Sequence, residues 1–199
     1  MLRSKVKKTV AGALSLTVAL GTALSSVSVL PILADDTLPD PALIPRPLES
    51  EFGEGRYTLK PCSRIVVEAG SEEDEQTLLN TADLLAQRMR KSTGYKLPVT
   101  SEGASTGDII LRTSDDKADL EEEGYTLTAD ETGVVIEAYE PAGVFNGTQT
   151  LRQMFPSDIE KQDVVEGTAW VVKEANITDK PEYEYRGMHL DVALSLIHI

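Results

Sequence analysis

The sequence predicts an α+β domain in which an antiparallel or mixed sheet carries two helices on one face. Several short runs rich in β-branched residues lie between glycines, prolines and other turn residues, as is typical of strands. Two longer segments instead place apolar residues at helical spacing. Along the chain the order is strands, helix, strands, helix, strand, which favours a layered α+β fold. An apolar content of 41% fits one ordinary globular domain.

The first strands follow a proline-rich linker. Residues 35–42 form this linker, which is too rich in proline for a helix and is expected to enter an extended segment at a sheet edge. Residues 55–60 and 64–69 are then predicted to be strands, because glycine and proline bracket both runs.

Residues 71–94 form the clearest predicted helix. Ser71 is placed to cap its start, acidic residues fill the first turn, basic residues fill the last turn, and Gly94 ends it. The acidic first turn is better explained as a solvated helix start than as a metal site. One apolar stripe runs along this helix, made of Leu78, Ala82, Leu85 and Met89.

Four short strands are predicted after this helix, at residues 96–100, 108–113, 123–130 and 133–140. The short connection ADETG joins the last two, so these two strands are expected to pair antiparallel as a hairpin.

A second helix is predicted over residues 141–155, with Pro141 in its first turn. Gly143 and Gly147 lie four residues apart on it. They either let another backbone approach closely or reflect loose helix propensity, and the sequence leaves both interpretations open. The apolar face of this helix consists of Val144, Thr148, Leu151 and Phe155. A final strand and turn are predicted over residues 168–181.

Residues 1–34 are predicted to be a secretory signal peptide. They combine a basic start, a long uncharged apolar stretch and small residues before the expected cleavage near Ala34. An uncleaved membrane anchor is the alternative, because the apolar run is long enough to span a bilayer. Pro31 and the Gly, Ser and Thr content favour removal. Under both interpretations, the rest of the chain is expected to be exported from a bacterial cell, as a secreted or cell-surface protein.

The exported part is strongly acidic. The whole chain has a net charge of −14, and residues 1–34 contribute +4 of it, which leaves −18 for the remainder. Such a surface repels phosphate backbones and anionic lipid, so nucleic acid is not an expected partner. A neutral substrate suits this charge better.

Cys62 is the only cysteine, so an internal disulfide is impossible. We expect it to be a small core residue, because a thiol nucleophile would need a histidine partner and the two histidines, His189 and His198, lie in the terminal stretch. The sequence contains no glycine-rich phosphate loop, no CxxC pair and no HExxH motif. We therefore expect neither a cofactor nor a metal site.

Arg186 is the candidate binding residue. It shares one parity with Met188, Leu190 and Val192, which indicates a buried strand with an arginine at its mouth. On spacing alone, an ion pair with a nearby acid such as Glu184 is the simpler interpretation.

Three stretches point to a known family: LIPRPLESEFGEGRYTL, GVVIEAYEPAGVFNGTQTLRQMF and ITDKPEYEYRGMHLDVA. In this order they resemble the leading non-catalytic domain and the first barrel strand of family 20 glycoside hydrolases, the β-N-acetylhexosaminidases. The resemblance implies a leading α+β domain over residues 43–180, followed over 181–193 by the first strand of a (β/α)8 barrel whose remainder is missing from this chain. It also implies that the two helices pack between the sheet and the barrel, so that one helix stripe covers the sheet and the other waits for the barrel. The helix face meant for the barrel would then be an exposed apolar patch on this chain.

The resemblance implies a chemistry as well. Arg186 would hydrogen-bond hydroxyls of the terminal amino sugar of an N-acetylglucosamine- or N-acetylgalactosamine-terminated glycan. The acetamido oxygen of the substrate attacks the anomeric carbon, an Asp polarises that amide, and a neighbouring Glu protonates the leaving oxygen. That Asp-Glu pair belongs to a later barrel strand, so the chain itself is expected to hold no catalytic residue and to be inactive.

Residues 194–199 depart from the family pattern. After the Asp that Asp191 matches, the family pattern continues with two residues and then Arg-His-aromatic, whereas this chain has Leu194, Ser195 and Leu196. LSLIHI is also what CTG TCT CTT ATA CAC ATC encodes, a string that resembles a transposon-end sequencing adapter, so we expect adapter read-through here.

Two alternatives for the function remain open: a stand-alone sugar-binding or structural module, and the leading domain of another glycosidase such as an α-glucuronidase.

Overall fold

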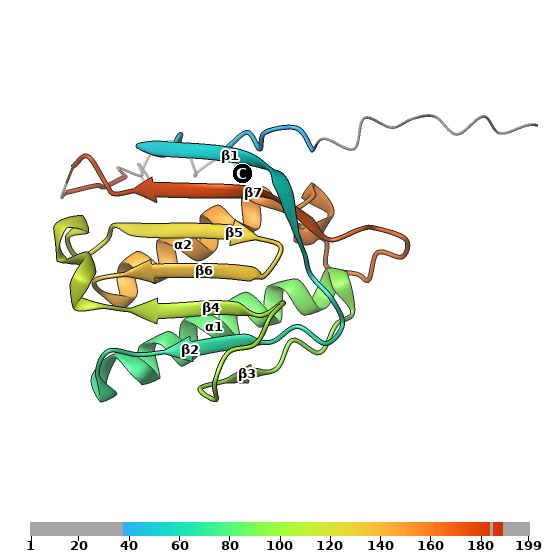
Figure 1. The fold of residues 1–199 in the computed structure, drawn as a ribbon, viewed down its shortest axis with the longest axis horizontal. Coiled ribbons are helices and arrows are strands. Elements are labelled where there is room, and N and C mark those ends of the chain that lie inside the picture. The colour runs from blue at the N-terminus through green and yellow to red at the C-terminus, as the bar shows by residue number, and fades with distance from the viewer. Residues whose placement is uncertain (1–37, 184, 189–199) are drawn as a thin grey trace, which may run out of the picture. The chain divides into compact units, whose positions relative to one another are not determined.

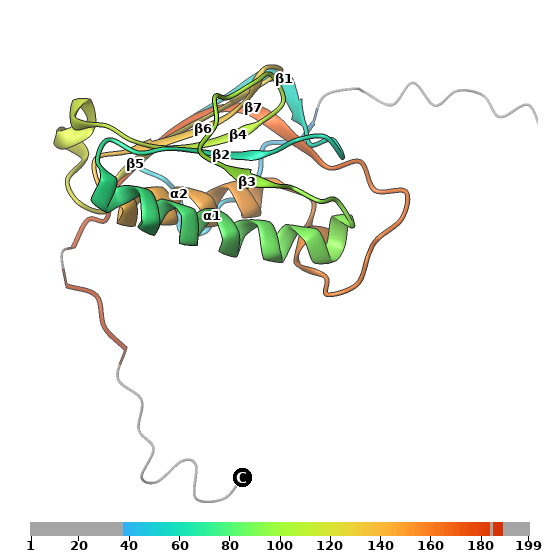
Figure 2. The ribbon, with the colours of Figure 1, turned by 90° about the horizontal axis from the view of Figure 1, so that it is seen from below.

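One seven-stranded sheet with two helices on a single face makes up the fold (Figure 1 and Figure 2). The computed structural model describes residues 38–183 and 185–188. The strands are β1 Glu49–Thr58, β2 Ile65–Glu68, β3 Val99–Thr100, β4 Ile109–Thr113, β5 Tyr125–Asp130, β6 Gly133–Ala138 and β7 Val171–Asp179. The helices are α1 Glu72–Thr93 and α2 Pro141–Met154, with short 3-10 turns η1 Asp115–Leu120 and η2 Ser157–Glu160. The α+β prediction is confirmed.

The sheet is mixed, with the strand order β1-β7-β5-β6-β4-β2-β3. β3, β2, β4 and β6 run parallel, whereas β5, β7 and β1 extend the sheet by antiparallel pairing. Parallel neighbours need a long crossover, and α1 supplies it after β2. The predicted hairpin is confirmed, because β5 and β6 pair antiparallel with Asp130 opposite Gly133.

α1 begins and ends where its sequence predicts. The Ser71 side chain accepts a hydrogen bond from the backbone N–H of Asp74 at 3.2 Å, which satisfies one of the free donors of the first turn. Gly94 adopts the left-handed conformation, with φ 69°, and donates its N–H to the Arg90 carbonyl. The predicted stripe from Leu78 to Met89 is buried against the sheet.

α2 approaches the sheet closely because of its glycines. A Cβ added to Gly143 would lie 2.1 Å from the carbonyl oxygen of Gly124, and one added to Gly147 would lie 2.4 Å from Ile136 Cγ2. Both distances are shorter than van der Waals contact allows. Close backbone approach is therefore the correct interpretation of Gly143, whereas Gly147 makes room for the side chains of Ile136 and Tyr125.

The core lies between the sheet and the helices. Alternate strand residues point into it, such as Leu127, Ile136 and Ile177, and these side chains are at most 1% exposed. The predicted face of the second helix is buried as well, since Val144, Thr148, Leu151 and Phe155 are 0 to 4% exposed. Both stripes therefore belong to the core of the domain, and the expectation that one of them is left for the barrel is wrong.

Three expectations differ from the structure. Cys62 is exposed in the turn before β2, so the prediction of a core cysteine is wrong. The run 96–100 contributes only the two-residue strand β3, since Pro98 has no N–H to donate to a ladder. β1 starts at Glu49 and is longer than the run 55–60, because the approach from the linker already pairs with β7.

Several predicted segments lie partly or wholly outside the described residues. The signal peptide at 1–34 and the read-through at 194–199 are such segments, as are His189 and His198. Of the barrel strand predicted over 181–193, the described residues 181–183 and 185–188 carry no strand assignment, and the rest stays a prediction. Within the described part, no helix combines the length and apolar character needed to cross a membrane.

Candidate functional site

Arg186, the predicted substrate-binding residue, lies on the segment that follows β7. Its Nη2 is 2.6 Å from Glu123 Oε2, and its Nη1 donates to the Tyr183 carbonyl at 2.8 Å. The side chain is 48% exposed. The suggested partner Glu184 lies outside the described residues, and Glu123 is the acid that pairs with Arg186. A role of Arg186 toward a sugar stays a prediction.

The loop 121–124 that carries Glu123 is fixed to α2 and to the exit of β7. Asn146 of α2 donates its Nδ2 to the Glu123 carbonyl at 2.9 Å. Lys180 forms an ion pair of 2.6 Å with Glu121 at the other end of the acidic run. Sequence spacing does not reveal these two pairs, because both cations come from segments about 60 residues away.

A broad cleft lies at the carboxyl ends of the parallel strands. Its volume is about 790 Å³, and its walls come from the residues after β2, β4 and β6 and from the first turns of α1 and α2. Ligands of open α/β sheets often bind at such an edge. Here the walls carry five carboxylates, Glu73, Asp74, Asp115, Glu122 and Glu140, so the cleft does not suit phosphate. Among the described residues, no three His, Cys, Asp or Glu side chains are grouped to hold a metal ion.

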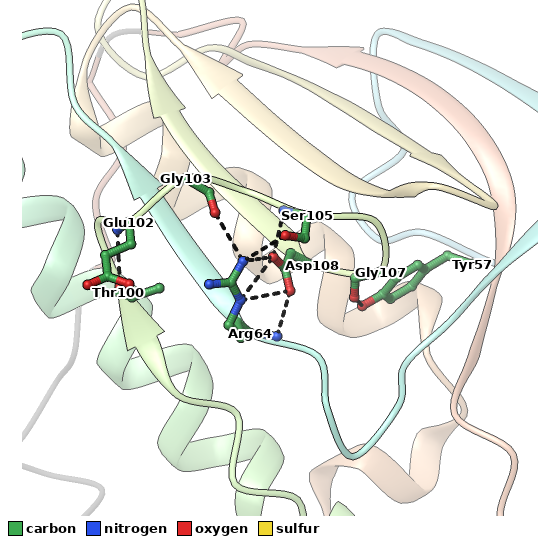
Figure 3. A network of polar contacts seen from close by, with 8 residues as sticks. All are labelled: Tyr57, Arg64, Thr100, Glu102, Gly103, Ser105, Gly107 and Asp108. Carbon is green, nitrogen blue, oxygen red and sulfur yellow. Dashed lines mark hydrogen bonds and ion pairs between the residues drawn. The ribbon is translucent and has the colours of Figure 1, made fainter.

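A polar network fixes the opposite end of the sheet (Figure 3). Asp108, which precedes β4, accepts hydrogen bonds from Arg64 Nη2 at 2.6 Å and from the Ser105 backbone N–H at 2.9 Å. Arg64 also donates to the Gly103 carbonyl, and the Tyr57 hydroxyl donates to the Gly107 carbonyl at 3.0 Å. These contacts tie the loop between β3 and β4 to the sheet. Their partners are all within the domain, so the network is structural.

The carboxyl groups with clearly shifted pKa values do not have the character of a general acid. Burial by itself raises the pKa of Asp108, but hydrogen bonds from the Arg64 side chain and from two backbone N–H groups hold it below its ordinary value. The hydrogen bond from the Thr132 side chain lowers the pKa of Asp130, which caps the β5–β6 hairpin. A glycosidase acid needs a raised pKa, and neither residue lines the cleft at the carboxyl edge.

The outer face of the helices is less apolar than expected. Leu84 of α1 is 51% exposed and Phe145 of α2 is 43% exposed, and they are the large apolar side chains that the described helices present to solvent. Between them lies a hollow of about 130 Å³ whose rim includes Arg88, Gln149 and Arg152. In place of the expected apolar patch, this surface has two exposed apolar side chains, Leu84 and Phe145, surrounded by polar residues.

The fold of this chain is similar to a part of several solved β-N-acetylhexosaminidases. A structure of the Streptomyces coelicolor family 20 β-N-acetylhexosaminidase is 38% identical with a TM-score of 0.63, over 72% of this chain and 27% of that chain. The Streptomyces plicatus enzyme in complex with its product GlcNAc is 34% identical with a TM-score of 0.64, over 76% of this chain and 29% of that chain. A β-hexosaminidase of Porphyromonas gingivalis is 30% identical over 157 residues, which are 79% of this chain and 19% of the relative.

The sequence pattern of glycosyl hydrolase family 20, domain 2, matches residues 40–180. The chain therefore belongs to this family. The chain covers 19% to 29% of the length of these relatives.

Proposed function

We propose that this chain is the leading, non-catalytic part of an exported β-N-acetylhexosaminidase. That enzyme removes terminal N-acetylglucosamine or N-acetylgalactosamine from glycans by substrate-assisted, retaining hydrolysis. The observation that carries the proposal is the domain 2 match over 40–180, together with relatives named as β-hexosaminidases that are several times longer than the match. The Streptomyces plicatus complex with GlcNAc supports an N-acetylhexosamine as the sugar that is recognised.

In this proposal the catalytic Asp and Glu come from the barrel of the longer protein. The described residues contribute a scaffold, because their shifted carboxyl groups, Asp108 and Asp130, serve a polar network and a hairpin. The acidic surface supports a neutral glycan in preference to a polyanion. The basic and apolar start of the sequence supports export.

Arg186 has two roles in the proposal, one in each context. In the domain alone it pairs with Glu123 on the surface, and such exposed pairs contribute only about 0.2 to 1 kcal/mol. Hydrogen bonds from a charged guanidinium to sugar hydroxyls contribute about 1.5 to 3 kcal/mol. The exchange from Glu123 to substrate is therefore favourable once the barrel positions the sugar.

A stand-alone sugar-binding module is the alternative, and the open face of the sheet does not favour it. Side chains on that face form two rows across the strands, with Thr128 opposite Asn176 and Val135, and Thr126 opposite Thr178 and Glu137. The side chains of these rows are not aromatic, whereas sugar sites commonly stack an aromatic ring on the pyranose face.

The test compares this chain with the longer protein whose reading frame contains it. The longer protein should release nitrophenol from an aryl N-acetyl-β-glucosaminide, and the purified chain of 199 residues should release none above buffer. Hydrolysis by the purified chain would overturn the division of labour between domain and barrel. A longer protein that folds but leaves N-acetylhexosaminides intact would overturn the proposed activity.

A further inference from the structure

The sequence contains two acceptor patterns for N-linked glycans, each an asparagine followed two positions later by a threonine. One begins at Asn146 in α2, and the other begins at Asn176 in β7. Such a pattern is usable only where the folded protein leaves the asparagine on its surface, because the attached sugar is bulky and hydrophilic. The two asparagines differ in this respect.

Asn146 is not suited to carry a glycan. Its side-chain Nδ2, the atom that glycosylation modifies, donates to the Glu123 carbonyl at 2.9 Å. The threonine of this pattern, Thr148, is only 2% exposed. A sugar on Asn146 would have to enter between α2 and the loop 121–124, and these two segments are already in close contact at Gly143 and Gly124.

Asn176 is exposed on the open face of the sheet, the face that the helices leave uncovered (Figure 2). Its side chain has neither a hydrogen bond nor an ion pair with any residue that the structure describes. Across the strands it lies opposite Glu51 of β1 and Thr128 of β5, which are a flexible and a small side chain. A glycan on Asn176 therefore extends into solvent without displacing the core.

Glu174 gives this second pattern a further feature. Glu174, Asn176 and Thr178 lie on one face of β7, because the residues between them, Ala175 and Ile177, are 1% exposed and belong to the core. Oligosaccharyltransferases of the bacterial class recognise an acid two positions before the asparagine as well as the hydroxyl two positions after it. The pattern in α2 lacks this acid, since a valine occupies the matching position.

We propose that Asn176 is an N-glycosylation site of the acid-dependent bacterial type, with Glu174 and Thr178 as the residues that the transferase recognises. The donor is an oligosaccharide joined to a lipid through a diphosphate. Nδ2 of Asn176 attacks the anomeric carbon of the donor sugar, so a C–N bond forms as the C–O bond to the diphosphate breaks. The lipid diphosphate is the leaving group, and one amide proton passes to solvent.

The transfer precedes the folding of β7. In the folded sheet β7 is paired on both sides, with β1 and with β5, so its backbone is not free to enter the active site of a transferase. Glu174 is also engaged there, because its Oε2 accepts a hydrogen bond from the Gly55 N–H at 2.8 Å. The inference therefore rests on the export in the proposed function, since an exported chain meets the transferase before it folds. It is independent of the proposed hydrolysis.

The test produces the 199-residue chain in a bacterium that contains an acid-dependent oligosaccharyltransferase and its lipid-linked oligosaccharide. Mass spectrometry of peptides from the periplasmic protein should find the oligosaccharide on Asn176 and none on Asn146. Asn176→Gln should abolish the modification, and Glu174→Gln should remove most of it, although glutamine keeps an oxygen that can accept from the Gly55 N–H. Asn146→Gln is the matched control and should leave the modification unchanged.

A second form of the chain separates the site from the proposed export, because a signal peptide of known function replaces residues 1–34 in it. Modification of this second form alone would contradict the export signal and leave the site standing. An unmodified Asn176 in periplasmic protein of the second form would overturn the site, and so would modification that Glu174→Gln leaves unchanged. The modified and unmodified proteins should have Tm values within about 1 °C of each other, and a much lower Tm of the modified protein would contradict the placement of the glycan in solvent.

Discussion

Glu123 Oε2 lies 2.6 Å from Nη2 of Arg186, although the two residues are 63 positions apart in the sequence. The pair connects the loop after η1 to the segment that leaves β7. Both side chains are partly exposed, at 39% for Glu123 and 48% for Arg186, so the pair holds the segment weakly.

Arg186→Ala should therefore change the stability of the chain only slightly and lower the activity of the longer protein strongly. In the 199-residue chain it should change the free energy of unfolding by less than about 1 kcal/mol, as should Glu123→Gln. In the longer protein it should lower kcat/KM by about 10- to 150-fold, if the lost hydrogen bonds are felt in the transition state. Arg186→Lys should restore this only in part, because an ammonium lacks the planar fork. Urea unfolding measures the stability and nitrophenol release measures kcat/KM, on the same sample. A destabilised variant with unchanged kcat/KM would contradict the substrate role of Arg186.

Gly143→Ala should destabilise the domain by about 1 to 3 kcal/mol or more. Alanine normally favours a helix over glycine by about 1 kcal/mol, but here the new methyl group meets a backbone oxygen of Gly124, which has no rotamer with which to move away. Urea unfolding of purified domain checks this. The matched control is Gly103→Ala, where nothing lies within 4 Å of the added carbon, and this variant should be neutral or slightly stabilised. If Gly143→Ala changed the free energy of unfolding no more than Gly103→Ala does, α2 would be able to move away from the loop that carries Gly124.

Stability should fall at low pH partly through Asp108. Its pKa is held below the ordinary value of about 3.9, so its contribution is fully present above about pH 4 and is lost as pH falls through the lower, folded-state value. Asp108→Asn should cost at least about 1.5 kcal/mol at pH 7, and the difference from the unsubstituted protein should shrink below pH 4. Urea midpoints between pH 7 and 2.5 measure this. Asp119→Asn, at an exposed aspartate of η1, is the control, and a pH-independent difference for Asp108→Asn would contradict the linkage.

Local rules explain why much of the fold could be predicted from the sequence. The limits of α1 depend on Ser71 and Gly94, whose roles are set by the backbone within one turn. The β5–β6 hairpin depends on a short connection in the same way. The buried stripes of both helices follow from apolar spacing, because a helix brings residues three and four apart onto one face.

Contacts between distant segments could not be predicted in this way. Cys62 has a residue type that is usually buried, and its exposure follows from the turn that it shares with Pro61 before β2. The pairing of Glu123 could not be predicted, since its partner Arg186 lies beyond β7. Arg88 belongs to the basic end of α1, and only the arrangement of α1 beside α2 places it on the rim of a hollow that Leu84 and Phe145 also line.

The pairing of β1 with β7 has a consequence for how this domain can be handled as a building block. Glu49, near the entrance of the chain, lies opposite Thr178, near its exit, in one antiparallel ladder (Figure 1). Entry and exit therefore share one corner of the sheet, and a unit with such neighbouring ends can be spliced into a surface loop of a host protein without stretching the host. The same feature makes the domain a candidate for circular permutation.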